Sequence, residues 1–190
     1  MRQKVQALVM FVAFLATSAA FAAGTYSIDP AHTSFTFTVK HMMISNVPGS
    51  FDKFSGEITY DPANVAASKA DVSIDVDSIN THIAKRDAHL KSPDFFDAAK
   101  FPAITFTSTK FTATEITGNL TMHGVTKEVT IPVTISGPVD EMGHQAIGIT
   151  GTLTLNRQDY GVNWNKTLDK GGLAVSNDVN IAISIEADQK

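Results

Sequence analysis

The stretch Ser34-Phe35-Thr36-Phe37-Thr38-Val39-Lys40 alternates polar and apolar residues without a break. Successive side chains of a β-strand point to opposite faces of a sheet, so a period of two predicts a strand with one buried face. The same alternation returns, strongly or weakly, in later segments: residues 54–60, 70–77, 104–110, 116–122, 127–135, 150–155 and 178–186. With residues 26–28 added at the start, the sequence predicts an all-β chain of about eight or nine strands.

Short turns separate these segments, and no long linker divides them. Turn-forming pairs fall between the strand patterns: Asp61-Pro62, His123-Gly124, Gly137-Pro138 and Met142-Gly143. Glycine and proline supply the backbone angles that tight connections require. We therefore expect the strands to form one domain.

Two stretches interrupt the strand pattern. Residues 79–100 have no period of two, and apolar residues stand there at helical spacing instead. We expect two short helices or turns, Ile83–Lys91 and Pro93–Ala98, because proline is well suited to the first position of a helix. Residues 156–175 form a second irregular stretch.

An antiparallel sheet with one apolar face must bury that face, either against another sheet or by closing on itself. About eight strands of roughly 8 to 10 residues suit closure, and a barrel of that size is filled by side chains or holds one small ligand. The fold prediction is therefore a single antiparallel β-barrel with a short helical insertion.

The strand faces predicted to point inward are apolar throughout the chain. The residues expected to line a central apolar pore are Phe35, Phe37, Val39, Phe51, Phe54, Val72, Ile74, Val76, Phe106, Leu120, Met122, Ile131, Val133, Leu153, Leu155, Val179 and Ile181. The pattern is compatible with a filled core and with a lined cavity. A cavity would select a chain-like lipid, because burying about ten methylene groups yields roughly 8 kcal/mol before the cost of immobilisation.

The N-terminus has the features of an export signal. Arg2 and Lys4 precede an uncharged apolar run, residues 7–20, and Ala20-Phe21-Ala22 offers small residues where a signal peptidase reads them. We expect residues 1–22 to be a cleaved signal peptide and residues 23–190 to be a periplasmic domain without stable membrane insertion. The alternative is an uncleaved N-terminal anchor.

Charge and composition exclude several classes of protein. The chain has 15 Lys+Arg against 19 Asp+Glu, a net charge of −4. Loss of Arg2 and Lys4 with the leader would take this to −6. An acidic chain lacks the basic footprint that nucleic-acid binding requires, and the absence of cysteine excludes disulfides and thiolate chemistry.

The densest polar cluster lies in the predicted helical insertion, at Arg86, Asp87 and His89. Cationic side chains at a barrel mouth could hold a phosphate or a quinone oxygen, and the alternative is a network that merely fixes the insertion. Arg157 could close one barrel end by pairing with Asp159 or Asp87. The chain's single Trp164 could cover an opening, meet a second subunit or pack as an ordinary aromatic residue.

Catalytic and metal-binding patterns are missing from the sequence. Ser34 follows His32 closely, but no glycine-flanked nucleophile elbow and no third member of a triad accompany them. His82 and His89 match no standard metal-ligand spacing. We expect a turn hydrogen bond between Asp29 and His32, no catalytic residue, no metal and no cofactor other than a bound lipid.

A series of short motifs in fixed order resembles the YceI-like lipid/polyisoprenoid-binding family. The motifs are Asp29-Pro30-Ala31-His32, Val39-Lys40-His41, residues 49–56, Ser78-Ile79-Asn80-Thr81, residues 86–92, Asp94-Phe95-Phe96-Asp97, residues 101–106, residues 118–127 and Asn156-Arg157-Gln158-Asp159-Tyr160-Gly161. Two departures are visible: Thr33 stands where members often have serine, and Tyr160 stands where phenylalanine is usual.

The resemblance implies a lipocalin-like barrel with an apolar pore, a helical insertion near one end and frequent homodimers. It also implies binding of polyprenyl chains, including isoprenoid quinones and polyprenyl phosphates, without enzymatic activity. We therefore expect periplasmic binding, transport or sequestration of a long-chain isoprenoid lipid. Two alternatives stay open: a lipid-modifying enzyme that uses Arg86, Asp87 and His89, and a stress-related structural protein whose core is filled.

Overall fold

The computed structural model describes residues 22–141, 143–169 and 171–190. The predicted leader therefore lies outside the described residues, apart from Ala22. The strands are β1 Gly24–Ile28, β2 Ser34–His41, β3 Ser45–Phe51, β4 Phe54–Tyr60, β5 Lys69–Asp75, β6 Ile79–Asn80, β7 Ala103–Phe111, β8 Glu115–Met122, β9 Val125–Glu141, β10 His144–Asn156 and β11 Val175–Gln189. The helices are α1 Ala84–Lys91 and the short 3-10 turns η1 Val65–Ala67, η2 Val76–Ser78 and η3 Arg157–Tyr160.

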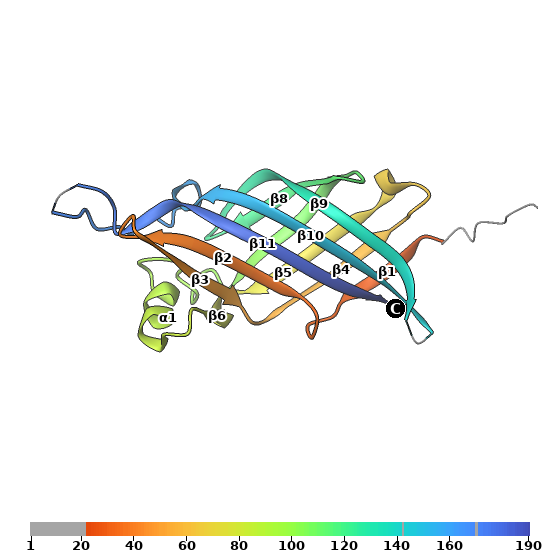
Figure 1. Cartoon of the computed structure of the whole chain (residues 1–190), viewed down its shortest axis with the longest axis horizontal. Helices are drawn as coiled ribbons and strands as arrows, with labels where there is room; N and C mark the ends of the chain where they lie inside the picture. The colour runs from red at the N-terminus through yellow and green to blue at the C-terminus, as the bar shows by residue number, and fades with distance from the viewer. Residues whose placement is uncertain (1–21, 142, 170) are drawn as a thin grey trace, which may run out of the picture.

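The sheet closes into a barrel. Strands β1, β4, β5, β7, β8, β9, β10 and β11 pair in that order, and β11 then pairs with β1 (Figure 1). Every pairing is antiparallel. The predicted all-β fold, a closed antiparallel barrel with one short helix, is confirmed.

Strand β11 changes partners along its length. It pairs with β2 between Val175 and Ser184 and with β1 between Ala187 and Gln189. At the break, the hydroxyl of Thr33 donates to the carbonyl of Glu186 (3.1 Å) and accepts from its amide (3.0 Å). The Glu186 carbonyl also accepts from the Asp29 amide (2.9 Å), so the Thr33 hydroxyl is its second donor and also supplies the acceptor for the Glu186 amide where the two strands meet.

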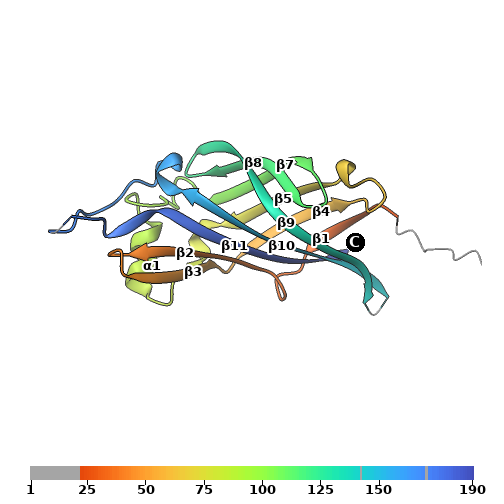
Figure 2. The same cartoon turned by 45° about the horizontal axis from the view of Figure 1, so that its top comes forward.

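The two ends of the barrel are closed differently. At the end near the C-terminus, a cluster of buried side chains fills the interior: Tyr26, Ile28, Phe35, Ile58, Tyr60, Ala70, Phe111, Ile116, Ile147, Ile149, Ile185 and Ala187. At the other end lie α1, the β2–β3 hairpin and the loop that follows η3 (Figures 1 and 2). We call the first the closed end and the second the mouth.

The helical insertion lies at the mouth. Helix α1 covers the first predicted segment, whereas residues 93–98 form turns. The carboxylate of Asp87 accepts a hydrogen bond from the amide of Thr81 (2.9 Å) and another from the Thr81 hydroxyl, which ties the helix to the strand end before it. None of the helices among the described residues is long and apolar enough to cross a membrane.

Candidate ligand-binding cavity

The barrel encloses a cavity of about 410 Å³ that is lined almost entirely by apolar side chains. Its wall takes residues from every strand of the closed barrel except β1, and from β2, β3 and α1. Cavities of several hundred Å³ with few polar groups are typical of small-molecule sites. The barrel is thus filled at the closed end and hollow toward the mouth. The sequence was compatible with a filled core and with a lined cavity, and the structure contains both.

Most of the residues predicted to line a pore lie in the wall of this cavity. These are Phe35, Phe37, Val39, Phe51, Val72, Ile74, Phe106, Leu120, Met122, Ile131, Val133, Leu153, Leu155, Val179 and Ile181. Strand alternation was sufficient to place them, because the inward face of each strand is the face that meets the cavity.

Two predicted residues do not line the cavity. Phe54 packs edge-on against Phe35, with ring centroids 4.9 Å apart, and Phe35 is the residue of this pair that forms the wall. Val76 is buried, but β5 ends at Asp75 and Val76 begins the turn η2. The predicted strand, residues 70–77, extends two residues beyond the end of β5.

The rings of Phe37 and Phe106 lie against the barrel wall because the residue beside each ring on the adjacent strand is a glycine. Phe37 is paired with Gly49, and a Cβ added to Gly49 would lie 2.3 Å from the Cζ atom of Phe37. In the same way, a Cβ on Gly118 would lie 2.5 Å from the Cζ atom of Phe106. The rings occupy the space that side chains at these two positions would take, which leaves the middle of the barrel open.

The wall also contains residues that the sequence did not single out. Val47 lies on β3, a strand that was not predicted because Pro48 and Gly49 obscure its alternation. Phe95 and Phe96 come from the turns after α1 and contribute at the mouth. Adjacent aromatic residues in an otherwise polar segment were the signal that could have found them.

Helix α1 brings two of the predicted polar residues to the cavity, Arg86 and His89, while Asp87 is not part of its wall. Arg86 donates from Nε to the Thr81 hydroxyl (2.7 Å) and from Nη2 to the Thr81 carbonyl (2.6 Å). Asp87 accepts from Thr81, so it holds in place the residue to which Arg86 donates. His89 Nε2 lies 2.8 Å from the carboxylate of Asp94.

Arg157 and Trp164 complete the mouth, and both line the cavity. Arg157 is buried and donates to three main-chain carbonyls, those of Ser176 (2.9 Å), Val162 (2.7 Å) and Trp164 (2.8 Å). The predicted pairing of Arg157 with Asp159 or Asp87 is wrong, because these carbonyls satisfy its donors instead. Burial lowers the pKa of Arg157, since removal from water disfavours the cation.

The Trp164 ring belongs to an aromatic group at the mouth. Its centroid lies 5.1 Å from that of Phe95 and 5.2 Å from that of His89, and His89 and Phe95 contact each other edge-on at 5.0 Å. This group joins the loop after η3 to the helical insertion. Because Trp164 lies in the cavity wall, its intrinsic fluorescence should change when a ligand binds at the mouth.

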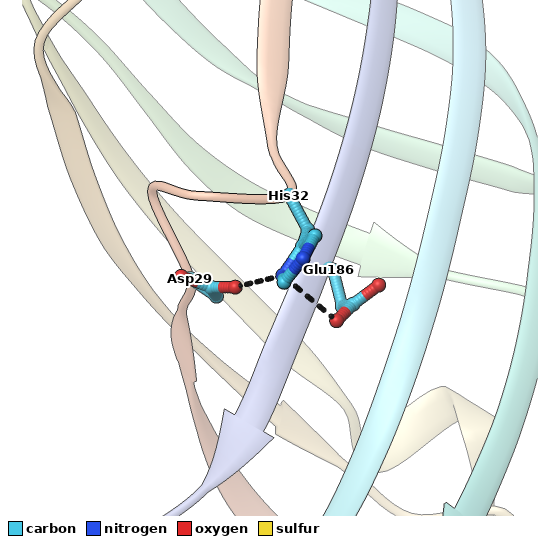
Figure 3. A group of neighbouring side chains, drawn as sticks. All are labelled: Asp29, His32 and Glu186. Atoms are coloured by element: carbon cyan, nitrogen blue, oxygen red, sulfur yellow. Dashed lines mark hydrogen bonds and ion pairs between the residues drawn. The ribbon is translucent and has the colours of Figure 1, made fainter.

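A second titratable cluster lies outside the cavity, where β1 gives way to β2. His32 Nδ1 lies 2.5 Å from Asp29 and 3.4 Å from Glu186 (Figure 3). The expected turn bond between Asp29 and His32 is confirmed, and Asp29 also accepts from the Ala31 amide (2.9 Å). That amide and then His32 lower the pKa of Asp29. The three donor atoms are close enough for a metal ion, but the exposed imidazole already bonds both carboxylates and ties the turn to β11.

Relatives in sequence extend over nearly the whole chain. The chain is 40% identical over 165 residues to UPF0312 protein SA2479 of Staphylococcus aureus (strain N315), covering 85% of this chain and 95% of that protein. UPF0312 protein SAB2563 from strain bovine RF122 / ET3-1 is 41% identical over the same length.

Solved structures share the fold. Burkholderia cenocepacia BcnA matches with a TM-score of 0.72 and 27% identity, covering 84% of this chain and 98% of that chain. The Campylobacter jejuni YCEI protein matches with a TM-score of 0.68 and 35% identity, covering 80% and 90%. A polyisoprenoid binding domain from Saccharophagus degradans has the same fold, with a TM-score of 0.63 at 17% identity and coverage of 87% and 98%.

The family model described as YceI-like domain matches residues 26–187, which include every strand of the barrel except the outermost residues of β1 and β11. The match and the relatives agree with the motifs found in the sequence. The chain belongs to the YceI-like domain family.

Proposed function

We propose that this protein binds one long-chain isoprenoid lipid, an isoprenoid quinone or a polyprenyl phosphate, with the tail inside the barrel. The observation that carries the proposal is the cavity of about 410 Å³, whose wall is almost entirely apolar, with its basic side chains at the mouth. The naming of the Saccharophagus degradans domain as polyisoprenoid binding gives it independent support.

The physical driving force is the hydrophobic effect. A hydrocarbon tail loses no hydrogen bonds on leaving water, and each buried methylene contributes about 0.8 kcal/mol. About ten buried methylene groups therefore yield roughly 8 kcal/mol before immobilisation is subtracted, and longer tails bind in the micromolar to nanomolar range. A wall without carboxylates or amines beyond the mouth imposes no desolvation cost on such a tail.

We further propose that the protein works in the periplasm, where it carries or sequesters its lipid, and that it forms homodimers. The location rests on the export signal that the sequence predicts for residues 1–22, and the dimer rests on the family resemblance. Binding rather than catalysis is proposed because Asp87, the carboxylate of the candidate cluster, is bonded to Thr81 and lies outside the cavity wall.

The proposal is tested by native mass spectrometry of protein that has been purified without detergent or solvent extraction. We expect an additional mass that is released on denaturation and partitions into organic solvent. Delipidated protein should then take up one polyprenol per chain. A protein that neither carries a lipid nor takes up a polyprenol would contradict the proposal.

A variant that fills the cavity tests the location of the tail. Leu153 and Ile181 are cross-strand partners, and both line the cavity. The double substitution Leu153→Phe and Ile181→Phe adds apolar volume without charge, so we expect binding to fall at least about tenfold while the fold is retained. Thr152→Phe, on the exposed face of the same strand, is the matched control and should bind normally.

A further inference from the structure

The distribution of charge around the cavity is one-sided. Among the described residues of its wall there is no carboxylate, although Asp and Glu outnumber Lys and Arg in the whole chain by 19 to 15. The charged and titratable groups of the wall are all cations or potential cations: Arg86, Arg157, His89 and His41. In an apolar enclosure, charges of one sign set the local potential more strongly than they would in water.

Arg157 is buried, with 5% of its surface accessible to water. It is therefore the charged residue of the wall for which a missing counter-charge costs most. Its partners are three carbonyl oxygens, which are neutral, and its Nη2 atom is buried without a hydrogen-bond partner. Within the described parts of the chain no ion pair joins Arg157 or Arg86 to a carboxylate. A buried arginine without a counter-charge is costly, and an anion brought close to it would relieve that cost.

The cations converge on one place. Trp164 accepts a hydrogen bond from Arg157 through its carbonyl, and its ring contacts His89 of α1. Arg86 lies on the same helix, and it too faces the cavity. Arg86, Arg157 and His89, the last of which is bonded to Asp94, therefore lie at the mouth, while the far part of the cavity ends at Ile58, Ile149 and Ile185 without any charged group.

We infer that the ligand carries an anionic head group, a phosphate or a carboxylate, that is held at the mouth by Arg86 and Arg157 while its tail runs toward the closed end. This inference rests on the proposed function: of the two head groups named there it keeps the phosphate and excludes the neutral quinone, and it adds a carboxylate as the other anion that the same side chains would hold. A neutral quinone or alcohol would leave Arg157 with neutral carbonyl partners alone, and Arg86 with the Asp87 carboxylate only through the Thr81 hydroxyl. An anionic head supplies a direct counter-charge and fixes the direction in which the lipid enters.

The test compares ligands that share a tail and differ in the head. Delipidated protein is titrated at constant pH with farnesyl phosphate and farnesol, and with hexadecanoate and hexadecanol, and the fluorescence of the single Trp164 reports occupancy. We expect each anion to bind at least about tenfold more tightly than its alcohol, as charge-assisted contacts require. The pair with the larger ratio of the alcohol's to the anion's dissociation constant identifies the head as a phosphate or a carboxylate.

Variants assign the preference to residues. Arg86→Gln should reduce the ratio of the two dissociation constants, whereas Lys85→Gln, an equal change of charge on the exposed side of the same helix, should leave it unchanged. Arg157→Gln should reduce the ratio further, and Arg157→Lys should partly retain it. A ratio is insensitive to the fraction of unfolded protein, so loss of the Arg157 contacts to the loop does not imitate the effect.

The outcomes separate the inference from the function on which it rests. Equal binding of anions and alcohols by the unaltered protein would overturn the inference and leave lipid binding intact. An anion preference that survives in both Arg86→Gln and Arg157→Gln would also overturn it. Failure of all four probes and of longer polyprenols to bind would instead contradict the proposed function.

Discussion

The closed end and the hollow half of the barrel are built from the same alternating strands, yet one is filled and the other is empty. At the closed end, large side chains such as Tyr26, Ile58 and Phe111 are almost completely buried against one another. In the hollow half, equally large rings, Phe37 and Phe106, lie over glycines of the adjacent strand. The position of these rings over glycines leaves space in the middle of the barrel.

This division separates stability from function within one fold. Side chains at the closed end contact others on all sides, so they contribute most to the free energy of unfolding. Side chains of the hollow half have the cavity on one side, and their remaining contacts are available to a ligand. Changes in the two halves should therefore have opposite consequences for stability and for binding.

The largest expected effect compares phenylalanines in the two halves. Phe111→Ala removes a ring that is 2% exposed and leaves a void, so we expect a loss of about 3–5 kcal/mol in the free energy of unfolding. Phe106→Ala enlarges a cavity that already exists, so its loss should be only about 1–2 kcal/mol. Urea unfolding of delipidated protein measures both. Equal losses of stability in the two variants would contradict the division into a filled and a hollow half.

An intermediate effect is expected at Gly49. Gly49→Ala places a methyl group on the Phe37 ring, and the ring has room to move only into the cavity. We expect a loss of about 1–2 kcal/mol in stability and weaker lipid binding. Gly148→Ala is the control, because its nearest atom would be Ser136 Cβ at 3.7 Å. Unchanged affinity in Gly49→Ala would show that the ring position does not decide the open volume.

The smallest effect is expected outside the barrel interior, at the turn between β1 and β2, where His32 joins Asp29 and Glu186. The pKa of Asp29 is lowered in the folded state, so its stabilising contribution is present above its ordinary pKa of 3.8 and is lost as the pH falls through the lower folded value. Asp29→Asn should therefore be slightly less stable than the unaltered protein near neutral pH. The difference should shrink in acid below the folded pKa. A difference that does not depend on pH would contradict this sign.

Much of this arrangement could be predicted from the sequence, and the exceptions have physical reasons. The alternation of polar and apolar residues correctly predicted that Phe35, Phe37 and Val39 face the interior, because a regular strand has only two faces. It failed at Val76 because the strand had already ended, and it could not decide between a filled and a hollow barrel. That choice depends on the pairing of Phe37 with Gly49 across two strands, which no single segment reveals.

The mouth was the least predictable part of the site. Arg86 and His89 were recognised because the helical spacing of their segment is visible in the sequence. The partners of Arg157 are main-chain carbonyls of Val162, Trp164 and Ser176, and carbonyls carry no sequence signature. Whether Arg157 has a charged or a neutral partner is therefore decided by the path of the loop backbone, which the sequence does not show.

The most direct test of the central claim is a crystal structure of the protein with farnesyl phosphate or hexadecanoate, whichever binds more tightly, carrying bromine at the end of its tail. Anomalous scattering would locate the bromine without reference to the rest of the ligand. The account predicts a single bromine site deep in the barrel near Ile58, Ile149 and Ile185, with the anionic head group at the mouth. Bromine at the mouth, on the outer surface or nowhere in the cavity would contradict it.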